Sequence, residues 1–344
     1  MSLPKVFGLD IGSSSIKLIQ FKDIASKTPK LFKVGSIETP AGTYGNADEA
    51  SKKKLSDAIK ELVDQVGPDT KDVVSAVSER DVFSTKIRFS FDDEKNLNES
   101  AYWAISRVMP VPIDTVKYGY LPITMIEQNG KKEMEALVIS VEKKISDQYA
   151  DIISMAGLTP YALETEGVAL VRSIARNLPT QNTQGSLIID IGSTSTGICI
   201  VRGQNIVYST SVQSGSEVIT RSIAQAFMLD VVQAEEYKKT YGLNEKFFEG
   251  KIANVIKPIL DTVLMDVNRA MQFFKQEYPD TSITSIKLLG DSSAMPNLIS
   301  YITKYLGVAA EIADPLFGIN TNKLEVANKQ AFAVAIGLAL KSDF

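Results

Sequence analysis

The sequence predicts an α/β protein built from two related lobes that face each other across a cleft. Two observations support this class. The chain of 344 residues exceeds the length at which a single hydrophobic core usually stops growing. In addition, residues 9–20 (LDIGSSSIKLIQ) recur as residues 189–200 (IDIGSTSTGICI). A repeat at this spacing indicates that each half of the chain begins with the same supersecondary unit.

Each copy of the repeat lies between two runs of apolar and β-branched residues, and we expect each to form a β-hairpin. Gly12 or Gly192 in the turn has no Cβ, so the backbone can bend sharply and approach an anion closely. Successive backbone N–H groups and hydroxyls can then surround phosphate oxygens. Asp10 or Asp190, just before the turn, can hold a hydrated Mg²⁺ ion. A single such turn is also compatible with an ordinary tight turn, but two copies favour a pair of loops that hold a triphosphate.

The composition excludes several classes of function. The chain contains no histidine, which excludes Ser-His-Asp and Cys-His catalysis and most zinc sites. The net charge of −4, from 37 basic and 41 acidic residues, offers no basic surface for nucleic acid or an anionic membrane. We expect a cytoplasmic protein, because no apolar run reaches about eighteen residues and no signal peptide is visible. Cys199, the single cysteine, lies in an apolar run and is expected to be a core residue.

Patterns of apolar residues around the hairpins predict alternating helices and strands. In the first half we expect helices over 49–66, 97–109, 143–156 and 166–177, and strands within 72–91, 116–126, 135–142 and 159–165. In the second half we expect strands over 206–213 and 285–290, and helices over 215–227, most of 231–277, 294–306 and 328–341. The order β-α-β-β-α within residues 80–157 indicates a small insert in the first lobe.

Three segments of the chain, FGLDIGSSSIKLIQF, IIDIGSTSTGICIVRG and LLGDSSAMPNL, together resemble the actin-like ATPase superfamily. Within that superfamily the chain is similar to the PilM family, the cytoplasmic actin-like proteins of type IV pilus assembly. The segments that carry the closer resemblance are AYWAISRVMPVPIDTVKYGY, ISDQYADIISMAGLTPYALETEGVALVRS, AEEYKKTYGL, VNRAMQFFKQE and AFAVAIGLAL. These segments span nearly the whole chain.

The resemblance implies an actin-like ATPase fold with a nucleotide cleft between its lobes. It further implies an FtsA-like arrangement, in which subdomain 1C is inserted in the first lobe in place of the 1B subdomain of actin. The expected subdomains are 1A (1–79 and 158–178), 1C (80–157), 2A (185–227 and 279–344) and 2B (228–278).

The resemblance also assigns residues to the nucleotide site. The two hairpins match the phosphate-1 and phosphate-2 loops, and the turn that begins at Gly290 matches the adenosine motif. The superfamily more often has a run of glycines at this last turn, so an ordinary strand-to-helix turn is the alternative. The residues expected to bind nucleotide are Asp10, Gly12, Ser13, Ser14, Ser15, Lys17, Asp190, Gly192, Ser193, Thr194, Ser195, Gly215, Glu235, Lys238, Gly290, Asp291 and Ser292. Asp10 and Asp190 are expected to hold Mg²⁺ through water.

Four of the charged residues have an alternative interpretation. Glu235 and Lys238 share one helix face and match a superfamily helix beside the ribose and base, although a solvated charged helix fits equally. Lys17 matches a lysine that contacts phosphates in several relatives, although an exposed strand lysine is the alternative. Glu166 is the candidate general base that orients the attacking water, or it only complements a helix macrodipole.

The function that the resemblance implies is an ATP-binding scaffold of the type IV pilus inner-membrane platform, at most a slow ATPase. Its partner would be the N-terminal cytoplasmic peptide of a PilN-like membrane protein, which recruits it to the inner face of the cytoplasmic membrane. The alternatives are an FtsA-like polymerising protein and a small-molecule kinase of the same superfamily. Self-association stays open. The chain stops at LALKSDF, after an apolar helix, and direct membrane insertion is therefore not expected.

Overall fold

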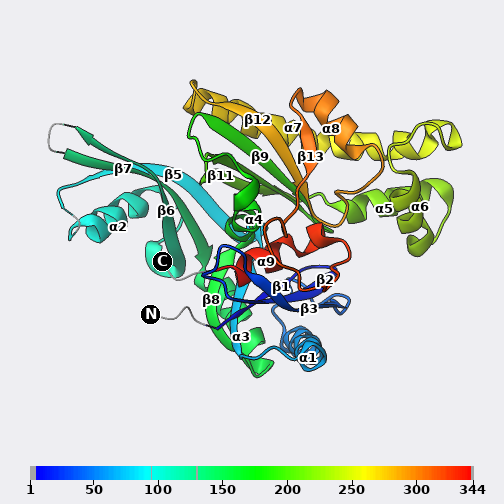
Figure 1. The fold of residues 1–344 in the computed structure, drawn as a ribbon, viewed down its shortest axis with the longest axis horizontal. Helices are drawn as coiled ribbons and strands as arrows, with labels where there is room; N and C mark the ends of the chain where they lie inside the picture. The colour runs from blue at the N-terminus through cyan, green and yellow to red at the C-terminus, as the bar shows by residue number, and fades with distance from the viewer. Residues whose placement is uncertain (1–4, 94, 129–130, 342–344) are drawn as a thin grey trace.

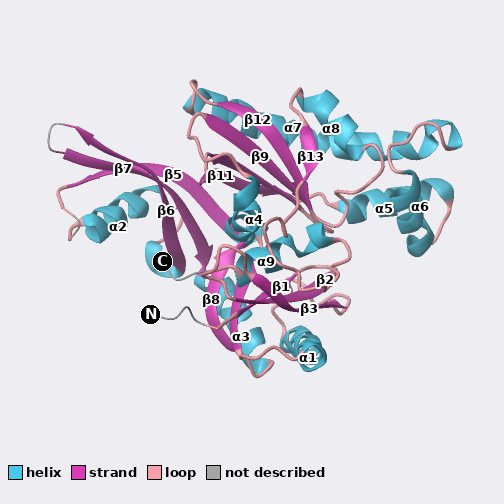
Figure 2. Cartoon of the chain, viewed as in Figure 1, coloured by secondary structure: helices cyan, strands magenta, loops and turns pink. Residues whose placement is uncertain are grey.

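The computed structural model describes residues 5–93, 95–128 and 131–341. Their strands form two five-stranded sheets and one three-stranded sheet. Each larger sheet is the centre of one lobe, and the three-stranded sheet extends away from both (Figure 1, Figure 2). No helix within the described ranges combines the length and the apolar character that a membrane span requires.

The two five-stranded sheets share one strand order. The first sheet is ordered β3 (Lys30–Glu38), β2 (Ser15–Lys22), β1 (Phe7–Ile11), β4 (Asp72–Val77) and β8 (Thr159–Thr165). The second is ordered β11 (Asn205–Val212), β10 (Thr196–Arg202), β9 (Gln184–Ile191), β12 (Ser282–Leu289) and β13 (Ala310–Ile312). In both, the first three strands pair antiparallel and the last three pair parallel. This identity confirms the two related lobes and both predicted hairpins.

One face of the first sheet is covered by helices α1 (Glu49–Val66) and α3 (Lys143–Met155), which pack against each other. Helix α1 begins where the Asp48 side chain accepts a hydrogen bond from the Ser51 N–H (2.9 Å), an ordinary N-cap. It ends at Gly67, whose φ of 62° is left-handed and favours glycine. The predicted helix 49–66 is therefore confirmed at both ends.

The second lobe carries helices α5 (Ser216–Phe227), α6 (Val231–Tyr241), α7 (Lys251–Glu277) and α8 (Leu298–Leu306). Helix α7 is the longest of the described helices, and it buries an apolar stripe against the second sheet. The residues of this stripe include Ile256, Leu260, Val263, Leu264 and Val267. Their three- and four-residue spacing explains why a helix forms here.

Two helices connect the lobes by crossing between them (Figure 1). Helix α4 (Glu166–Ile174) follows strand β8 of the first lobe, and its Ala169 and Leu170 belong to a core cluster that continues into the second lobe. Helix α9 (Ala333–Ala339), at the end of the second lobe, packs against strand β1 of the first. A Cβ on Gly337 would lie 1.8 Å from the Ala169 carbonyl oxygen. Only glycine therefore allows this close crossing.

The three-stranded sheet consists of β5 (Val82–Phe91), β7 (Lys131–Glu142) and β6 (Val116–Gln128), in that order. Together with helix α2 (Leu97–Val108) it encloses a small core of its own. The element order agrees with the β-α-β-β-α pattern expected for residues 80–157. Helix α3, however, also contributes Ile152 and Ile153 to the core of the first lobe. The subdomain boundaries themselves stay predictions.

Several predicted helices differ from the observed ones at their ends. The helix expected over 294–306 begins only at Leu298, because Pro296 lacks an N–H group and Asn297 has a φ of 62°. The helices expected over 166–177 and 328–341 are shorter and adjoin 3-10 turns. The stretch 231–277 is interrupted near Gly242. The 3-10 turns of the described residues are η1 (Glu79–Asp81), η2 (Ile113–Thr115), η3 (Ala175–Asn177), η4 (Phe248–Gly250) and η5 (Lys329–Phe332).

Candidate functional site

The turns of the two repeated hairpins meet across the cleft between the lobes. Gly12 N–H donates to the Ser15 carbonyl oxygen (3.1 Å), and Gly192 N–H donates to the Ser195 carbonyl oxygen (3.0 Å), so both turns close with the same bond. The Thr194 hydroxyl of the second turn donates to the Ser13 hydroxyl of the first at 3.2 Å. Turns that lie 180 positions apart in the sequence thus form one surface of hydroxyl and backbone N–H groups.

A polar cavity of about 70 Å³ lies between these turns. The predicted residues that line it are Asp10, Gly12, Ser13, Ser14, Lys17, Glu166, Asp190, Gly192, Ser193, Thr194, Ser195, Gly290 and Asp291. Five lining residues were not predicted from the sequence, and these are Tyr44, Gly197, Gln330, Ala331 and Val334. Gly197 lies within the repeated segment 189–200, two positions after Ser195, and this proximity was a usable signal. Tyr44 and Gln330 lie outside the motifs named above, and Ala331 and Val334 lie in the segment AFAVAIGLAL, which was not expected to line the site.

Ser15, Gly215, Glu235, Lys238 and Ser292 were predicted to bind nucleotide but do not line this cavity. Ser15 closes the first turn through its carbonyl group. Gly215 lies behind the second turn, where a Cβ would come within 2.3 Å of the Ser193 carbonyl oxygen. From there the N–H groups that open helix α5 donate to the Gly192 and Ser193 carbonyls, each at 2.9 Å. Helix α5 therefore supports the second turn from behind.

Lys238 of helix α6 is buried against helix α5, with 2% of its surface exposed. Its Nζ lies 2.6 Å from Glu235 Oε2 and donates to the Thr220 hydroxyl at 2.9 Å. The Thr220 hydroxyl donates in turn to Glu235 at 2.6 Å. Burial lowers the pKa of Lys238, although the adjacent Glu235 acts in the opposite direction. The alternative of a fully solvated charged helix is therefore wrong for Lys238.

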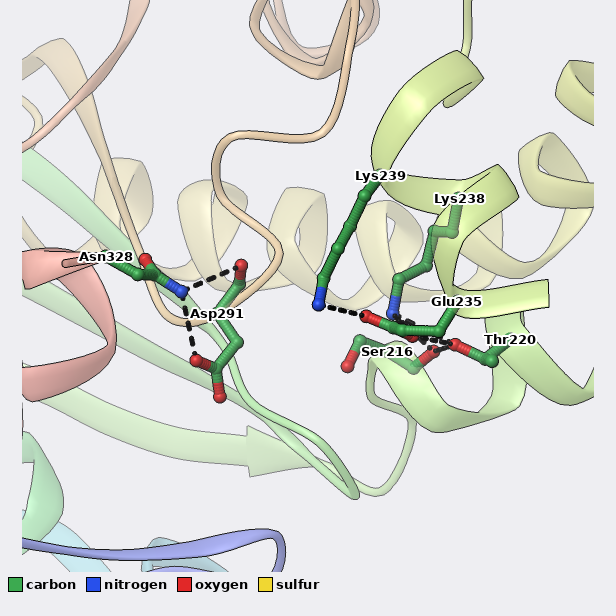
Figure 3. Close-up of polar contacts among 7 residues, drawn as sticks. All are labelled: Ser216, Thr220, Glu235, Lys238, Lys239, Asp291 and Asn328. Carbon is green, nitrogen blue, oxygen red and sulfur yellow. Dashed lines mark hydrogen bonds and ion pairs between the residues drawn. The ribbon is translucent and has the colours of Figure 1, made fainter. Parts of the chain in front are cut away.

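Asp291 and Asn328 lie opposite this network (Figure 3). The Asn328 side-chain amide donates to Asp291 Oδ1 at 3.1 Å, which fixes the carboxylate at the turn after strand β12. Gly290, directly before it, has a φ of 88°, and a Cβ there would lie 2.4 Å from the Ile191 carbonyl oxygen. The turn thus requires glycine only at its first position, where the second hairpin passes close to it.

The cavity contains more carboxylates than cations. Among the described residues that line it, Lys17 is the single cation, and Asp10, Glu166, Asp190 and Asp291 are acidic. Lys17 is buried, 7% exposed, and its Nζ lies 3.5 Å from Asp10 Oδ2. Its side chain therefore faces the cleft, and the alternative of an exposed strand lysine is wrong.

Desolvation within the cavity raises the pKa of the carboxyl groups of Asp10, Glu166 and Asp190. The pKa of Glu166 is raised to about 8 by burial, with the charges of Asp10, Glu79 and Asp190 adding to the effect. The pKa of Asp190 is raised to about 7 by burial and by the charge of Asp10. Burial also raises the pKa of Asp10, against the opposing effect of Lys17. A cation in the cavity would relieve this repulsion.

No group of three or more acidic or cysteine side chains within the described ranges is arranged as a ready metal site. The carboxyl groups of Asp10 and Asp190 nevertheless fit a hydrated Mg²⁺ ion, which keeps most of its waters and needs only one or two carboxylates. Cys199 is 1% exposed, and burial raises the pKa of its thiol. The prediction of a core cysteine is therefore confirmed.

The raised pKa of Glu166 predicts how stability depends on pH. An acid whose pKa rises on folding binds its proton more tightly in the folded state, so its contribution to stability falls as pH rises. For Glu166 this loss should extend from its ordinary value of 4.5 to about 8. We expect Glu166→Gln to unfold at a higher temperature than the unchanged protein at pH 8, and to show no such advantage at pH 4. Thermal unfolding followed by circular dichroism, without nucleotide or metal, measures this difference. A difference that stays constant over this range would contradict the assignment.

The two lobes share one strand order, the turns of their hairpins face each other, and helices α4 and α9 cross between them. These features define this chain as a protein with the actin-like ATPase fold. The solved structure of MreB5 of Spiroplasma citri bound to ADP has this fold, with a TM-score of 0.57 and 12% identity over 96% of this chain and 94% of that chain. A family model described as type IV pilus assembly protein PilM matches residues 8–343. The chain belongs to this family.

Two further comparisons agree with the family. A chain in the solved structure of a PilM-PilN type IV pilus biogenesis complex superposes with a TM-score of 0.84 and 28% identity, over 98% of each chain. The cell division protein FtsA of Streptococcus pneumoniae serotype 2 (strain D39 / NCTC 7466) is 20% identical over 373 residues, 96% of this chain and 79% of that protein. The resemblance seen in the sequence is therefore confirmed, with an FtsA-type relative at greater distance.

Proposed function

We propose that this protein is a nucleotide-dependent scaffold of type IV pilus assembly that binds Mg-ATP between its hairpins and docks an extended segment of a PilN-like membrane protein. The observation that carries this proposal is membership of the PilM family together with 28% identity to a chain of a PilM-PilN complex. The docked segment would hold the protein at the inner face of the cytoplasmic membrane.

In the nucleotide site, the backbone N–H groups and hydroxyls of both turns would bind the phosphates. Lys17 would add a positive charge, and Asp10 and Asp190 would hold Mg²⁺ through water. Glu166 would orient a water molecule toward the terminal phosphate. The two turns are in contact through the hydrogen bond between Thr194 and Ser13, and the cavity between them is only about 70 Å³. Entry of a nucleotide would therefore separate the turns and break this bond.

The structure offers a groove for an extended peptide between two open strand edges. Strand β6 is the edge of the three-stranded sheet, and strand β8 is the edge of the first five-stranded sheet. A cavity of about 330 Å³ lies between them, lined by Lys117–Leu121, Ile139–Val141, Leu163–Thr165 and Val168, among others. Glu164 is already paired with Lys341 (2.6 Å) and Arg172 (2.6 Å). The groove thus offers apolar surface beside two sheet edges.

These features suit a segment that binds as an added strand. Main-chain hydrogen bonds to a sheet edge supply affinity, and side-chain pockets on alternate residues supply specificity. Two edges facing one groove allow an extended peptide to pair on either side. We therefore place the PilN-like segment between β6 and β8, where it would touch both the insert sheet and the first lobe.

Gly119 offers a direct test of this groove. It lies on β6 within the groove lining, and a Cβ there would meet no atom within 4 Å, so Gly119→Trp can fill the groove without disturbing the core. We expect this variant to bind a synthetic N-terminal peptide of a PilN-like protein at least about tenfold more weakly, equal to about 1.4 kcal/mol. Fluorescence anisotropy with the labelled peptide measures the affinity.

The matched control is Met125→Trp, because Met125 lies on the same strand, is 60% exposed and is outside the groove lining. This control should bind the peptide as the unchanged protein does. Equal affinity of both tryptophan variants would place the docking site elsewhere and would refute this part of the proposal.

A further inference from the structure

We propose that Glu79 is a positioning residue that holds Glu166 in the nucleotide cleft and couples this cleft to the insert sheet. The inference deepens the proposed function and rests on it. Glu79 lies in turn η1, where the chain passes from strand β4 of the first lobe into strand β5 of the insert. Its side chain is buried, with 5% of the residue exposed.

Glu79 and the start of helix α4 are joined by reciprocal hydrogen bonds. The backbone N–H of Glu79 donates to Glu166 Oε2 at 2.9 Å. The backbone N–H of Gly167 donates to Glu79 Oε2 at 3.0 Å. Each of these two segments thus supplies both a carboxylate and a backbone donor to the other. Because Glu166 lines the nucleotide cavity, its position is fixed through Glu79.

The second oxygen of Glu79 reaches the other lobe. The hydroxyl of Ser209, on strand β11, donates to Glu79 Oε1. The Ser209 carbonyl group accepts a hydrogen bond from the Ser84 hydroxyl on strand β5 of the insert, at 2.7 Å. One buried carboxylate therefore touches the first lobe, the helix that crosses between the lobes, and the second lobe. Ser209 extends the connection to the insert.

The contact between Glu79, Gly167 and Ser209, called the joint below, is tightly packed. A Cβ on Gly167 would lie 2.5 Å from the Ser209 hydroxyl and 3.0 Å from the Cys199 sulfur. Helix α4 can therefore approach strand β11 only because residue 167 is glycine. A tightly packed joint of this kind shifts as a unit rather than deforming continuously. Movement of the second lobe, when a nucleotide enters, would be passed to strand β5.

Strand β5 belongs to the same sheet as strand β6, the insert edge of the groove. A shift of this sheet relative to strand β8 would change the width of the groove. Nucleotide and peptide would then bind with coupled affinities, and this coupling would depend on the contacts of Glu79 and Ser209. By thermodynamic linkage, the peptide must change the affinity for nucleotide by the same factor by which nucleotide changes the affinity for the peptide.

The test uses the full chain and Ser84→Ala, which removes the hydroxyl that connects the insert to Ser209 without touching either site. Three affinities are measured by calorimetry: for a non-hydrolysable ATP analogue with Mg²⁺, for the PilN-like peptide, and for the peptide with saturating nucleotide. In the unchanged protein we expect nucleotide to alter peptide affinity by about tenfold. In Ser84→Ala this factor should fall below about twofold while both single affinities stay within about twofold.

Ser90→Ala is the matched control, because Ser90 lies on the same strand and its hydroxyl donates to Glu133 of the insert. It should keep the full coupling. Glu79→Ala should lose both the coupling and part of the nucleotide affinity. Glu79→Gln keeps the shape of the side chain and one accepting oxygen but replaces the other with an NH2 group, so it should keep only part of the coupling.

Each outcome distinguishes the two proposals. If the unchanged protein binds both ligands without coupling, or if Ser84→Ala keeps the coupling, the role of Glu79 is refuted and the proposed function stands. The role is equally refuted if Glu79→Ala folds and keeps the full coupling. If the unchanged protein binds neither ligand, the proposed function fails, and the inference that rests on it fails with it.

Discussion

Replacement of Gly192 by aspartate is expected to weaken nucleotide binding by at least about a hundredfold, or about 2.8 kcal/mol. A Cβ at this position would lie 3.0 Å from the Ser195 carbonyl oxygen, so the backbone of the turn must shift by a few tenths of an ångström. The new carboxylate would also join Asp10, Glu166 and Asp190, opposed by Lys17 alone among the described lining cations. Both effects act against a polyphosphate, the first by moving backbone donors and the second by charge repulsion.

Calorimetric titration with ATP, in the presence and absence of Mg²⁺, measures this loss. The control is Gly119→Asp, which introduces the same side chain where a Cβ meets no atom within 4 Å and should bind ATP normally. Gly192→Asp should in turn keep its affinity for the PilN-like peptide. If Gly192→Asp binds ATP as tightly as the control, the two turns do not hold the phosphates.

Replacement of Gly337 by valine is expected to lower the free energy of unfolding by about 3 kcal/mol or more, at the upper end of the usual cost of overpacking. The reason is the crossing of α9 and α4, where a Cβ on Gly337 would lie 1.8 Å from the Ala169 carbonyl oxygen. Backbone atoms cannot rotate out of the way as a flexible side chain can. The two helices, and with them the two lobes, would have to move apart.

Urea denaturation followed by circular dichroism measures this effect through the midpoint and slope of the transition. Gly119→Val, on an open strand position, is the control and should change stability by less than about 0.5 kcal/mol. Nucleotide affinity of Gly337→Val should also fall, because the cleft walls are set by this crossing. Unfolding of both valine variants at the same urea concentration would show that the crossing is not tightly packed in solution.

Much of the site could be predicted because its chemistry is local. The turns from Asp10 to Ser15 and from Asp190 to Ser195 each contain, within six residues, the glycine, hydroxyls and carboxylate that such a loop requires. Helix α1 was equally predictable, since its apolar spacing, its cap and its terminal glycine all lie within one short segment. The repeat then fixed the two-lobed architecture, because similar segments fold into similar units.

Residues whose role depends on distant segments could not be found in this way. Glu79 meets Glu166 and Ser209 from 87 and 130 positions away, and no spacing in the sequence indicates such a meeting. Tyr44 enters the cavity from a loop without a motif. The burial of Lys238 was also missed, because helix α6 has a mixed charged face whose covered side is decided only by helix α5.

The sequence by itself determined the hairpin turns, the lobes and the family, because glycine, hydroxyl and carboxylate groups act within a few bonds of the backbone that they shape. Tertiary structure alone decided which strand edges stay open, how closely Gly337 and Ala169 approach, and which carboxylates share a buried cavity. These properties depend on steric contacts, burial and electrostatic interactions between segments that lie far apart in the chain. Such contacts and interactions form only when the chain has folded.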